Sequence, residues 1–357
     1  MFDRKKQWDG HKNTGTRIIA LTLVVTVAVL LATGTAAAQS SVNSCQEITS
    51  SGNYVVDANL DGGGGDCIVV SASDVTIEND GNVISNSTNA GAAAVNVTSG
   101  VSNVELVDLI VEDSNHAVYA PIEQGETTSG LSIEGLTTES ISDDAIDIDP
   151  NIDSTIEDLE ILDSTTVSNS EALFVNGDEE GVSILDVRIS DNDIETNTDG
   201  IEIETQNANS TTIRNVRITD NVVSTTSDGI YFDGDSDDAG GPTPVKDVLI
   251  AGNTIEGSTS DGIEFDYNSN GFQGPVRRLT VRDNVIDGAS DAGIEFEPEE
   301  DGFVGEDITF SNNVINNADN EGFDLDMDGD GQDLEIEVVG NEIDGGSDGI
   351  DIDYDGD

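Results

Sequence analysis

Residues 262–266 read Gly-Ile-Glu-Phe-Asp, a small residue followed by apolar side chains that alternate with acidic ones. Alternation with a period of two predicts a β-strand with one buried face and one solvated face. The apolar residue that opens this strand recurs every 27 to 33 residues. It falls at Ile146, Leu173, Ile201, Ile230, Ile263, Ile294, Phe323 and Ile350, and weaker copies lie at Val118 and Val95. One strand therefore repeats along most of the chain.

A second column of the repeat is formed by asparagine. It contains Asn192, Asn221, Asn253, Asn284, Asn313 and Asn341. Its spacing follows the first column through the same changes in repeat length, so each repeat is one structural unit whose loops absorb insertions. Apolar residues before and after each asparagine predict two further short strands. We expect the asparagines to form a ladder of side chains at a turn, with a structural role.

Three strands per repeat, without helical periodicity, predict an all-β right-handed parallel β-helix of about ten coils. The period of two excludes helical solenoids, and the short turns marked by glycine exclude propeller blades. The repeats resemble those of the parallel β-helix family that is associated with pectin lyases and with carbohydrate-binding and sugar-hydrolase domains. This resemblance covers about residues 45–357 and implies a polysaccharide partner. At ~4.8 Å per coil, the solenoid would be about 50 Å long.

The chain is strongly acidic, with 74 Asp and Glu against 12 Lys and Arg and a formal net charge of −62. Such a chain repels nucleic acid, which excludes a nucleic-acid partner. Intrinsic disorder would explain the composition, but the regular spacing of Ile and Val contradicts it. We therefore expect a folded, halophilic secreted protein of the haloarchaeal type, because molar salt shortens the Debye length to about 3 Å.

The first 38 residues have the pattern of an export signal. Residues 1–17 carry net positive charge, residues 18–31 are almost entirely apolar, and residues 36–38 are three alanines that suit cleavage. The alternative is an uncleaved anchor, because residues 18–38 contain no charge and are long enough to cross a bilayer. In either case the sequence predicts an extracellular or cell-surface protein that touches the membrane only through this segment.

Cys45 and Cys67 are the only cysteines. In an exported protein such a pair predicts a disulfide, which would contribute about 3 kcal/mol by closing its loop. The alternative, a metal-binding or redox thiol pair, lacks a nearby histidine. We expect residues 39–72 to form an N-terminal cap and residues 73–357 to form the repeats.

Carboxylates occupy the outward positions of the repeated strand. Glu264, Asp266, Glu295 and Glu297 are two such pairs on successive repeats. Side chains two residues apart lie about 7 Å apart on one face, and the next coil is ~4.8 Å away. Crowded carboxylates favour hard cations, so these residues are candidate calcium ligands. The alternative is a solvated acidic surface that diffuse monovalent ions neutralise.

A second candidate calcium site lies near the C-terminus. Asp326, Asp328, Asp330 and Glu337, with Gly331 between them, have the spacing of an EF-hand loop. The flanking residues are predicted to be strands rather than helices, and Asp333 replaces the usual apolar residue. Calcium remains the only cofactor that the sequence suggests.

Basic residues are also aligned. Arg214, Lys246 and Arg277 each lie seven residues before an asparagine of the ladder. Together with Tyr231, this row is a candidate substrate-binding site for an anionic polysaccharide, because guanidinium groups suit carboxylates. The alternative is internal charge balance with the neighbouring acidic column of Asp186, Asp247 and Asp307.

Catalytic motifs are incomplete. Residues 197–200 (Asn-Thr-Asp-Gly) resemble the first motif of polygalacturonases, but the Gly-His-Gly and Arg-Ile-Lys motifs of those enzymes are missing. An elimination like that of pectate lyases needs calcium and an arginine base, for which Arg277, Arg278 and Arg282 are candidates. The sequence therefore predicts polysaccharide binding along the side of the solenoid. A calcium-dependent lyase or glycoside hydrolase, and a structural surface rod, remain as alternatives.

Overall fold

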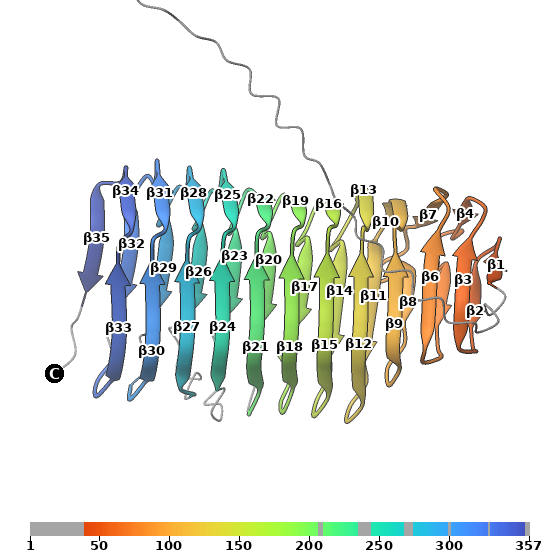
Figure 1. Ribbon diagram of the computed structural model, residues 1–357, viewed down its shortest axis with the longest axis horizontal. Helices are drawn as coiled ribbons and strands as arrows, with labels where there is room; N and C mark the ends of the chain where they lie inside the picture. Colours follow the sequence, from red (N-terminus) through yellow and green to blue (C-terminus); the bar gives the residue numbers. More distant parts are fainter. Residues whose placement is uncertain are drawn as a thin grey trace, which may run out of the picture. The chain divides into compact units, whose positions relative to one another are not determined.

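The computed structural model describes residues 39–205, 210–234, 244–267, 274–298, 301–327 and 329–353. The regular elements within these ranges are all β-strands, and they form three parallel sheets (Figure 1). The colours of the strands follow the sequence from the red β1 at one end to the blue β35 at the other, so successive coils stack in chain order. Among these residues, no helix is long and apolar enough to cross a membrane.

Sheet A contains the longest strands. They are β1 (Ser40–Val42), β3 (Gly52–Val56), β6 (Val75–Asn79), β9 (Ser102–Val107), β12 (Thr127–Glu134), β15 (Thr155–Leu162), β18 (Ser183–Ser190), β21 (Thr212–Thr219), β24 (Val245–Ala251), β27 (Val276–Arg282), β30 (Val304–Ser311) and β33 (Asp333–Val339).

Sheet B contains the strands with acidic–apolar alternation. They are β2 (Gln46–Ile48), β5 (Ile68–Val70), β8 (Ala93–Val97), β11 (His116–Ile122), β14 (Ile146–Pro150), β17 (Leu173–Asn176), β20 (Ile201–Glu204), β23 (Ile230–Asp233), β26 (Ile263–Asp266), β29 (Ile294–Glu297), β32 (Glu321–Asp326) and β35 (Asp348–Asp353).

Sheet C has the shortest strands. They are β4 (Leu60–Asp61), β7 (Val83–Ser87), β10 (Ile110–Ser114), β13 (Thr137–Ile141), β16 (Thr165–Val167), β19 (Asp193–Glu195), β22 (Val222–Ser224), β25 (Thr254–Glu256), β28 (Val285–Asp287), β31 (Val314–Asn316) and β34 (Glu342–Asp344).

From β3 onward, each coil runs through sheet A, then sheet C, then sheet B, and pairs in parallel with the next coil. Strand β26, for example, pairs with β29 so that Ile263 lies beside Ile294 and Glu264 beside Glu295. The predicted coil of three strands is confirmed, and so is the predicted alignment of equivalent residues.

The inward side chains of the three sheets form one continuous apolar core. Phe232 and Phe265 from successive coils stack with their ring centroids 5.1 Å apart, and Phe296 packs edge-on against Phe265. A Cβ atom added to Gly262 would lie 2.5 Å from the carbonyl oxygen of Gly293. The small residue before the first column is therefore required by the close approach of successive coils.

The asparagine ladder is confirmed at the corner between sheets A and C. The side-chain amide of Asn253 donates hydrogen bonds to the carbonyl of Ile218 and to Oδ1 of Asn284, both at 3.0 Å. The same Oδ1 atom accepts a hydrogen bond from the backbone N–H of Asn253. Asn253 is fully buried, so the ladder satisfies polar groups that water cannot reach.

The predicted disulfide joins Cys45 to Cys67, whose Cα atoms are 4.4 Å apart. Residues 40–70 contribute β1 to β5, the first strands of the three sheets. The predicted export signal, residues 1–38, lies outside the described residues and remains a prediction.

Candidate functional site

The outer face of sheet B, called the sheet B face below, carries the most unusual chemistry of the molecule. Its first outward row is set by strand register and contains Tyr119, Asp147, Phe174, Glu202, Tyr231, Glu264, Glu295, Asp324 and Asp351. Its second outward row contains Asp149, Asn176, Glu204, Asp233, Asp266, Glu297, Asp326 and Asp353. The part of these rows formed by Glu264, Asp266, Glu295 and Glu297 was predicted from the sequence.

In the first half of this face, aromatic and acidic residues alternate. Tyr119, Phe174 and Tyr231 occupy the first row on every second coil, and Asp147 and Glu202 lie between them. All three rings are half-buried. With coils ~4.8 Å apart, neighbouring rings are about 10 Å apart. The hydroxyl of Tyr119 donates a hydrogen bond of 3.0 Å to Asp149, which fixes that ring.

A third row lies at the corner that leads into sheet B, two residues before the first column of each repeat. It is called the corner row and contains His116, Asp144, Glu171, Asp199, Asp228, Asp261, Ala292, Glu321 and Asp348. Oδ1 of Asp228 accepts a hydrogen bond of 2.7 Å from the backbone N–H of Asp261, and Asp199 does the same for Asp228 at 2.8 Å. One oxygen of Asp199 and one oxygen of Asp228 therefore each cap the turn of the next coil.

Many carboxyl groups of the sheet B face are buried or half-buried and crowded, which makes ionisation costly, whereas Asp351 and Asp353 at its end are exposed. Burial, together with the charges of its acidic neighbours, raises the pKa of Glu202 to about 9 and that of Glu264 to about 10. The same causes raise the pKa of Asp147 to about 7. Several of these carboxyl groups therefore hold protons at neutral pH unless cations lie among them.

The predicted calcium ligands of this face lie together. One oxygen each of Glu264, Asp266 and Glu297 lies within 4.8 Å of the others, and Glu295 is paired with Glu264 in register. Burial raises the pKa of Glu295 to about 11. Either protons or cations can relieve this crowding, so calcium at these residues stays a prediction.

The residues with EF-hand spacing are distributed over two sheets. Asp326 ends β32 in sheet B, whereas Glu337 lies in β33 of sheet A with an exposed side chain. Asp330 lies in the turn between them, and Asp328 is outside the described residues. Calcium at this turn also stays a prediction.

The three residues of the predicted basic row lie on neighbouring strands of sheet A. Arg214 pairs in register with Lys246, and Lys246 pairs with Arg277. Tyr231 lies on sheet B, so the structure separates it from these three residues.

Ion pairs involve four of the basic side chains on sheet A. Nε of Arg278 is 2.5 Å from Oδ1 of Asp247 and Nε of Arg277 is 3.0 Å from Glu306. Arg282 contacts Asp283 at 2.5 Å and Arg188 contacts Glu160 at 3.7 Å. Within the predicted row only Arg277 has an ion pair among these contacts, and its partner is Glu306 rather than the column of Asp186, Asp247 and Asp307, so the charge-balance alternative stays open. The candidate lyase bases Arg277, Arg278 and Arg282 lie on β27, in sheet A, and not on the acidic sheet B face.

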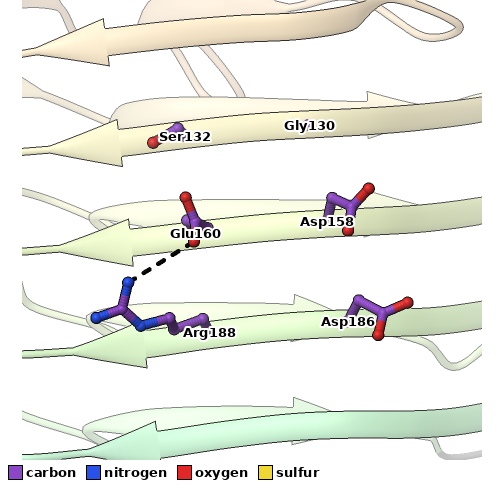
Figure 2. A pocket seen from close by; sticks show the side chains of 6 residues that line it. All are labelled: Gly130, Ser132, Asp158, Glu160, Asp186 and Arg188. Atoms are coloured by element: carbon purple, nitrogen blue, oxygen red, sulfur yellow. Dashed lines mark ion pairs between the residues drawn. The ribbon is translucent and has the colours of Figure 1, made fainter.

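Sheet A also bears a shallow depression of about 340 Å³ (Figure 2). It is lined by Gly130, Ser132, Asp158, Glu160, Asp186 and Arg188 of strands β12, β15 and β18. Figure 2 shows Arg188 turned toward Glu160, with the two aspartates side by side on neighbouring strands. This depression carries no aromatic side chain, and its one cation is paired.

Tyr119, Phe174 and the corner row were not predicted from the sequence to lie on one surface. The information was available, because Tyr119 and Phe174 directly follow Val118 and Leu173 of the first column. The corner row likewise keeps a constant offset from that column.

A family model described as a right-handed β-helix region matches residues 121–297 and 243–356, which together exceed half of the chain. The chain belongs to the right-handed β-helix family. This membership confirms the fold that the repeats predicted, including its handedness. None of the curated proteins has a matching sequence.

Several solved structures are similar to this chain at low sequence identity. The endo-xylogalacturonan hydrolase of Aspergillus tubingensis is 15% identical, with a TM-score of 0.44 and 87% of each chain covered. A tailspike protein of E. coli bacteriophage HK620, in complex with a pentasaccharide, is 11% identical with a TM-score of 0.45. That match covers 88% of this chain and 58% of the tailspike chain. A surface adhesin of Streptococcus pneumoniae is 14% identical, with a TM-score of 0.39 and coverages of 86% and 82%. These similarities concern the fold alone.

Proposed function

We propose that this protein is an extracellular or cell-surface protein that binds a polysaccharide along its sheet B face. The observation that carries the proposal is the row in which Tyr119, Phe174 and Tyr231 recur on every second coil with carboxyl groups between them. A ring every ~10 Å matches roughly two sugar units of an extended chain. Such a chain would run across the coils, along the axis of the solenoid.

The side chains of this row supply both kinds of contact that a sugar needs. The faces of aromatic rings pack against the C–H faces of pyranose rings, and half-buried rings lose little conformational freedom on binding. Burial raises the pKa of Glu202 to about 9, so its carboxyl group is protonated at neutral pH. A protonated carboxyl group both donates and accepts hydrogen bonds, as sugar hydroxyls do.

The charge of the chain favours a neutral polysaccharide over an acidic one. Asp and Glu outnumber Lys and Arg by 74 to 12, so the molecule repels uronates and sulfates even where carboxyl groups of the sheet B face hold protons. The arginines that suit an anionic polymer lie on sheet A, and several of them are paired with acids. The ligand class is therefore proposed to be a neutral, hydroxyl-rich glycan.

The test compares one aromatic variant with a variant on the other face. Phe174→Ala should weaken binding to a soluble neutral polysaccharide roughly tenfold, the loss of one ring contact of about 1.4 kcal/mol. Affinity electrophoresis and calorimetry would measure the change. Arg188→Ala, in the depression on sheet A, should leave the affinity unchanged. If only the Arg188 variant loses binding, the polysaccharide site lies on sheet A. If the parent protein binds no glycan, the proposal is wrong.

A second function is supported by a different observation on the same face. Glu171, Asp199 and Glu202 each place one oxygen within 4.8 Å of the others. Burial raises the pKa of Glu202, whereas for Glu171 hydrogen bonds from Asp144 and Ser170 outweigh burial and lower the pKa. Neighbouring carboxyl groups whose pKa values are pushed apart suit an acid and a nucleophile or base in glycoside hydrolysis. Asp199 also belongs to the stretch that resembles the polygalacturonase motif.

Product analysis by mass spectrometry separates hydrolysis from binding alone. Hydrolysis would shorten the polysaccharide without creating unsaturated ends, and Glu202→Gln would abolish the cleavage while preserving most of the affinity. Unsaturated products would indicate a lyase instead, and Arg277, Arg278 and Arg282 would then be substituted first. Uncleaved polymer that still binds would leave binding as the function.

A further inference from the structure

The imidazole of His116 lies among carboxylates at the start of the corner row. His116 is 5% exposed, at the first residue of β11. Its Nδ1 atom is 3.9 Å from Oδ2 of Asp144 and 4.0 Å from Oδ2 of Asp147, two residues of the next coil. The backbone carbonyl of Asp144 accepts a hydrogen bond of 3.2 Å from the same nitrogen in the tautomer that carries its proton there. Three side chains and one carbonyl thus converge on a single point.

The carboxylates of this cluster are not satisfied by hydrogen bonds to the imidazole. Their distances from Nδ1 exceed hydrogen-bonding length. Asp144 is only 7% exposed, and its side chain is hydrogen-bonded to Glu171, whereas its Oδ1 atom has no hydrogen-bond partner. Donor atoms that share a tetrahedral ion at about 2.1 Å lie about 3.4 Å apart, so a small contraction would bring these donors onto one ion.

The second nitrogen of the ring faces a further carboxylate. Nε2 of His116 is 3.8 Å from Oδ2 of Asp143, whose side chain is half-exposed. Metal-bound histidines usually donate their other N–H to a carboxylate, which fixes the tautomer and raises the basicity of the ligand. A coordinated Nδ1 carries no proton, so metal binding at Nδ1 would place the ring proton on Nε2, opposite Asp143.

We propose that His116, Asp144 and Asp147 bind one first-row divalent metal ion, with Asp143 as the hydrogen-bond partner of the coordinated ring. One nitrogen and two carboxylates suit Zn²⁺ better than calcium, which takes oxygen ligands alone. The other clusters of the sheet B face contain only carboxylates. This site differs in its residues and its metal from the calcium sites that the sequence predicted.

The ion would join two neighbouring coils and neutralise two buried carboxylates. It would also lie beside the polysaccharide row, because the rings of His116 and Tyr119 stack with their centroids 5.5 Å apart. The proposal does not depend on polysaccharide binding, and its test uses no glycan.

The experiment uses the full chain with His11→Gln in every variant, so that His116 is the only histidine. Zn²⁺ is titrated calorimetrically in excess Ca²⁺, which occupies weak carboxylate sites. The expected result is one tight Zn²⁺ site per chain. His116→Gln should weaken it more than about 100-fold and Asp143→Asn about 10- to 100-fold. The matched control is Glu297→Gln in an all-carboxylate cluster, which should leave the tight site unchanged.

NMR provides a measurement that does not depend on the folding of a variant. Zn²⁺ should shift the Nδ1 resonance of His116 in the parent chain at one equivalent. A tight site that survives His116→Gln in a folded protein would overturn the proposal. An Nδ1 resonance that ignores Zn²⁺, or a Glu297→Gln variant that loses the site equally, would overturn it as well.

Discussion

At the scale of single residues, Arg278 stands out because of its backbone. Its φ of 56° lies in the left-handed region, at a bend inside the strands of sheet A. The same position holds Asn103, Gly130, Asp158, Asp186, Asn215, Asp247 and Asp307 on other coils, all with positive φ. Asn, Asp and Gly tolerate this conformation, whereas for other residues it costs about 1 kcal/mol or more. Arg278 is held there by its two hydrogen bonds to Asp247.

We predict that Arg278→Asn leaves the protein as stable or more stable, by up to about 1 kcal/mol, because an exposed ion pair contributes less than the backbone strain. Urea denaturation would measure the free energy of unfolding. Arg282→Asn is the matched control, since it also removes an exposed ion pair but its backbone is not left-handed. Arg282→Asn should not raise the free energy of unfolding. A loss above about 1 kcal/mol at position 278 would mean that the ion pair dominates.

The asparagine ladder gives a second prediction at the residue scale. Asn253→Ala removes two donated hydrogen bonds and leaves Asn221 without its buried acceptor. The expected loss is about 2–4 kcal/mol in the free energy of unfolding. Asn341→Ala, at the half-buried end of the ladder, should cost less because water can replace its bonds. If both variants lose the same free energy of unfolding, burial does not decide how much each asparagine of the ladder stabilises the fold.

At the scale of elements, the stacked strands of sheet B make stability depend on pH. Glu264 ionises near pH 4.5 in the unfolded chain, but burial raises its folded pKa to about 10. Between these values the folded state keeps a proton that the unfolded state has lost. The free energy of unfolding should therefore fall as the pH rises from 5 to 9.

Glu264→Gln should reduce this fall by at least about 1 kcal/mol, because an uncharged amide replaces the protonated carboxyl group. Denaturation at pH 5, 7 and 9 would measure it. Glu256→Gln, an exposed position on β25, is the control and should preserve the fall. Stability that is constant over this range would contradict the argument. If calcium binds this face, its addition should flatten the pH dependence of the parent protein.

At the scale of the whole molecule, a net charge of −62 opposes folding through self-repulsion. We predict that the melting temperature rises by several degrees between low salt and molar NaCl, as the Debye length falls from about 30 Å toward 3 Å. Differential scanning calorimetry would follow the transition. Millimolar calcium should also rescue the protein in low salt if the acidic rows bind it. A melting temperature that ignores both ions would contradict this account and the halophilic interpretation.

Much of the architecture could be predicted from the sequence because it depends on local patterns that repeat. The alternation in residues 262–266 decides which side chains enter the core, and the offset of nine or ten residues between the asparagine column and the first column decides how the coils stack. The ladder and the stacked carboxylates of Glu264 and Glu295 follow directly from these two facts, and the structure confirms them. A strand and its register are properties of short segments, so a single sequence is enough to predict them.

Only the tertiary structure decided which columns share a surface. Tyr231 and Arg214 are close in sequence, yet the turns of the coil place them on sheets B and A. His116 and Asp147 are far apart in sequence, yet one coil brings them to 4.0 Å. Which sheet a residue lies on depends on how the three sheets close around the core. Burial then decides which carboxyl groups keep their protons. The sequence alone therefore determined the solenoid and its rows, whereas the neighbours and charge states of those rows arise from how the coils pack.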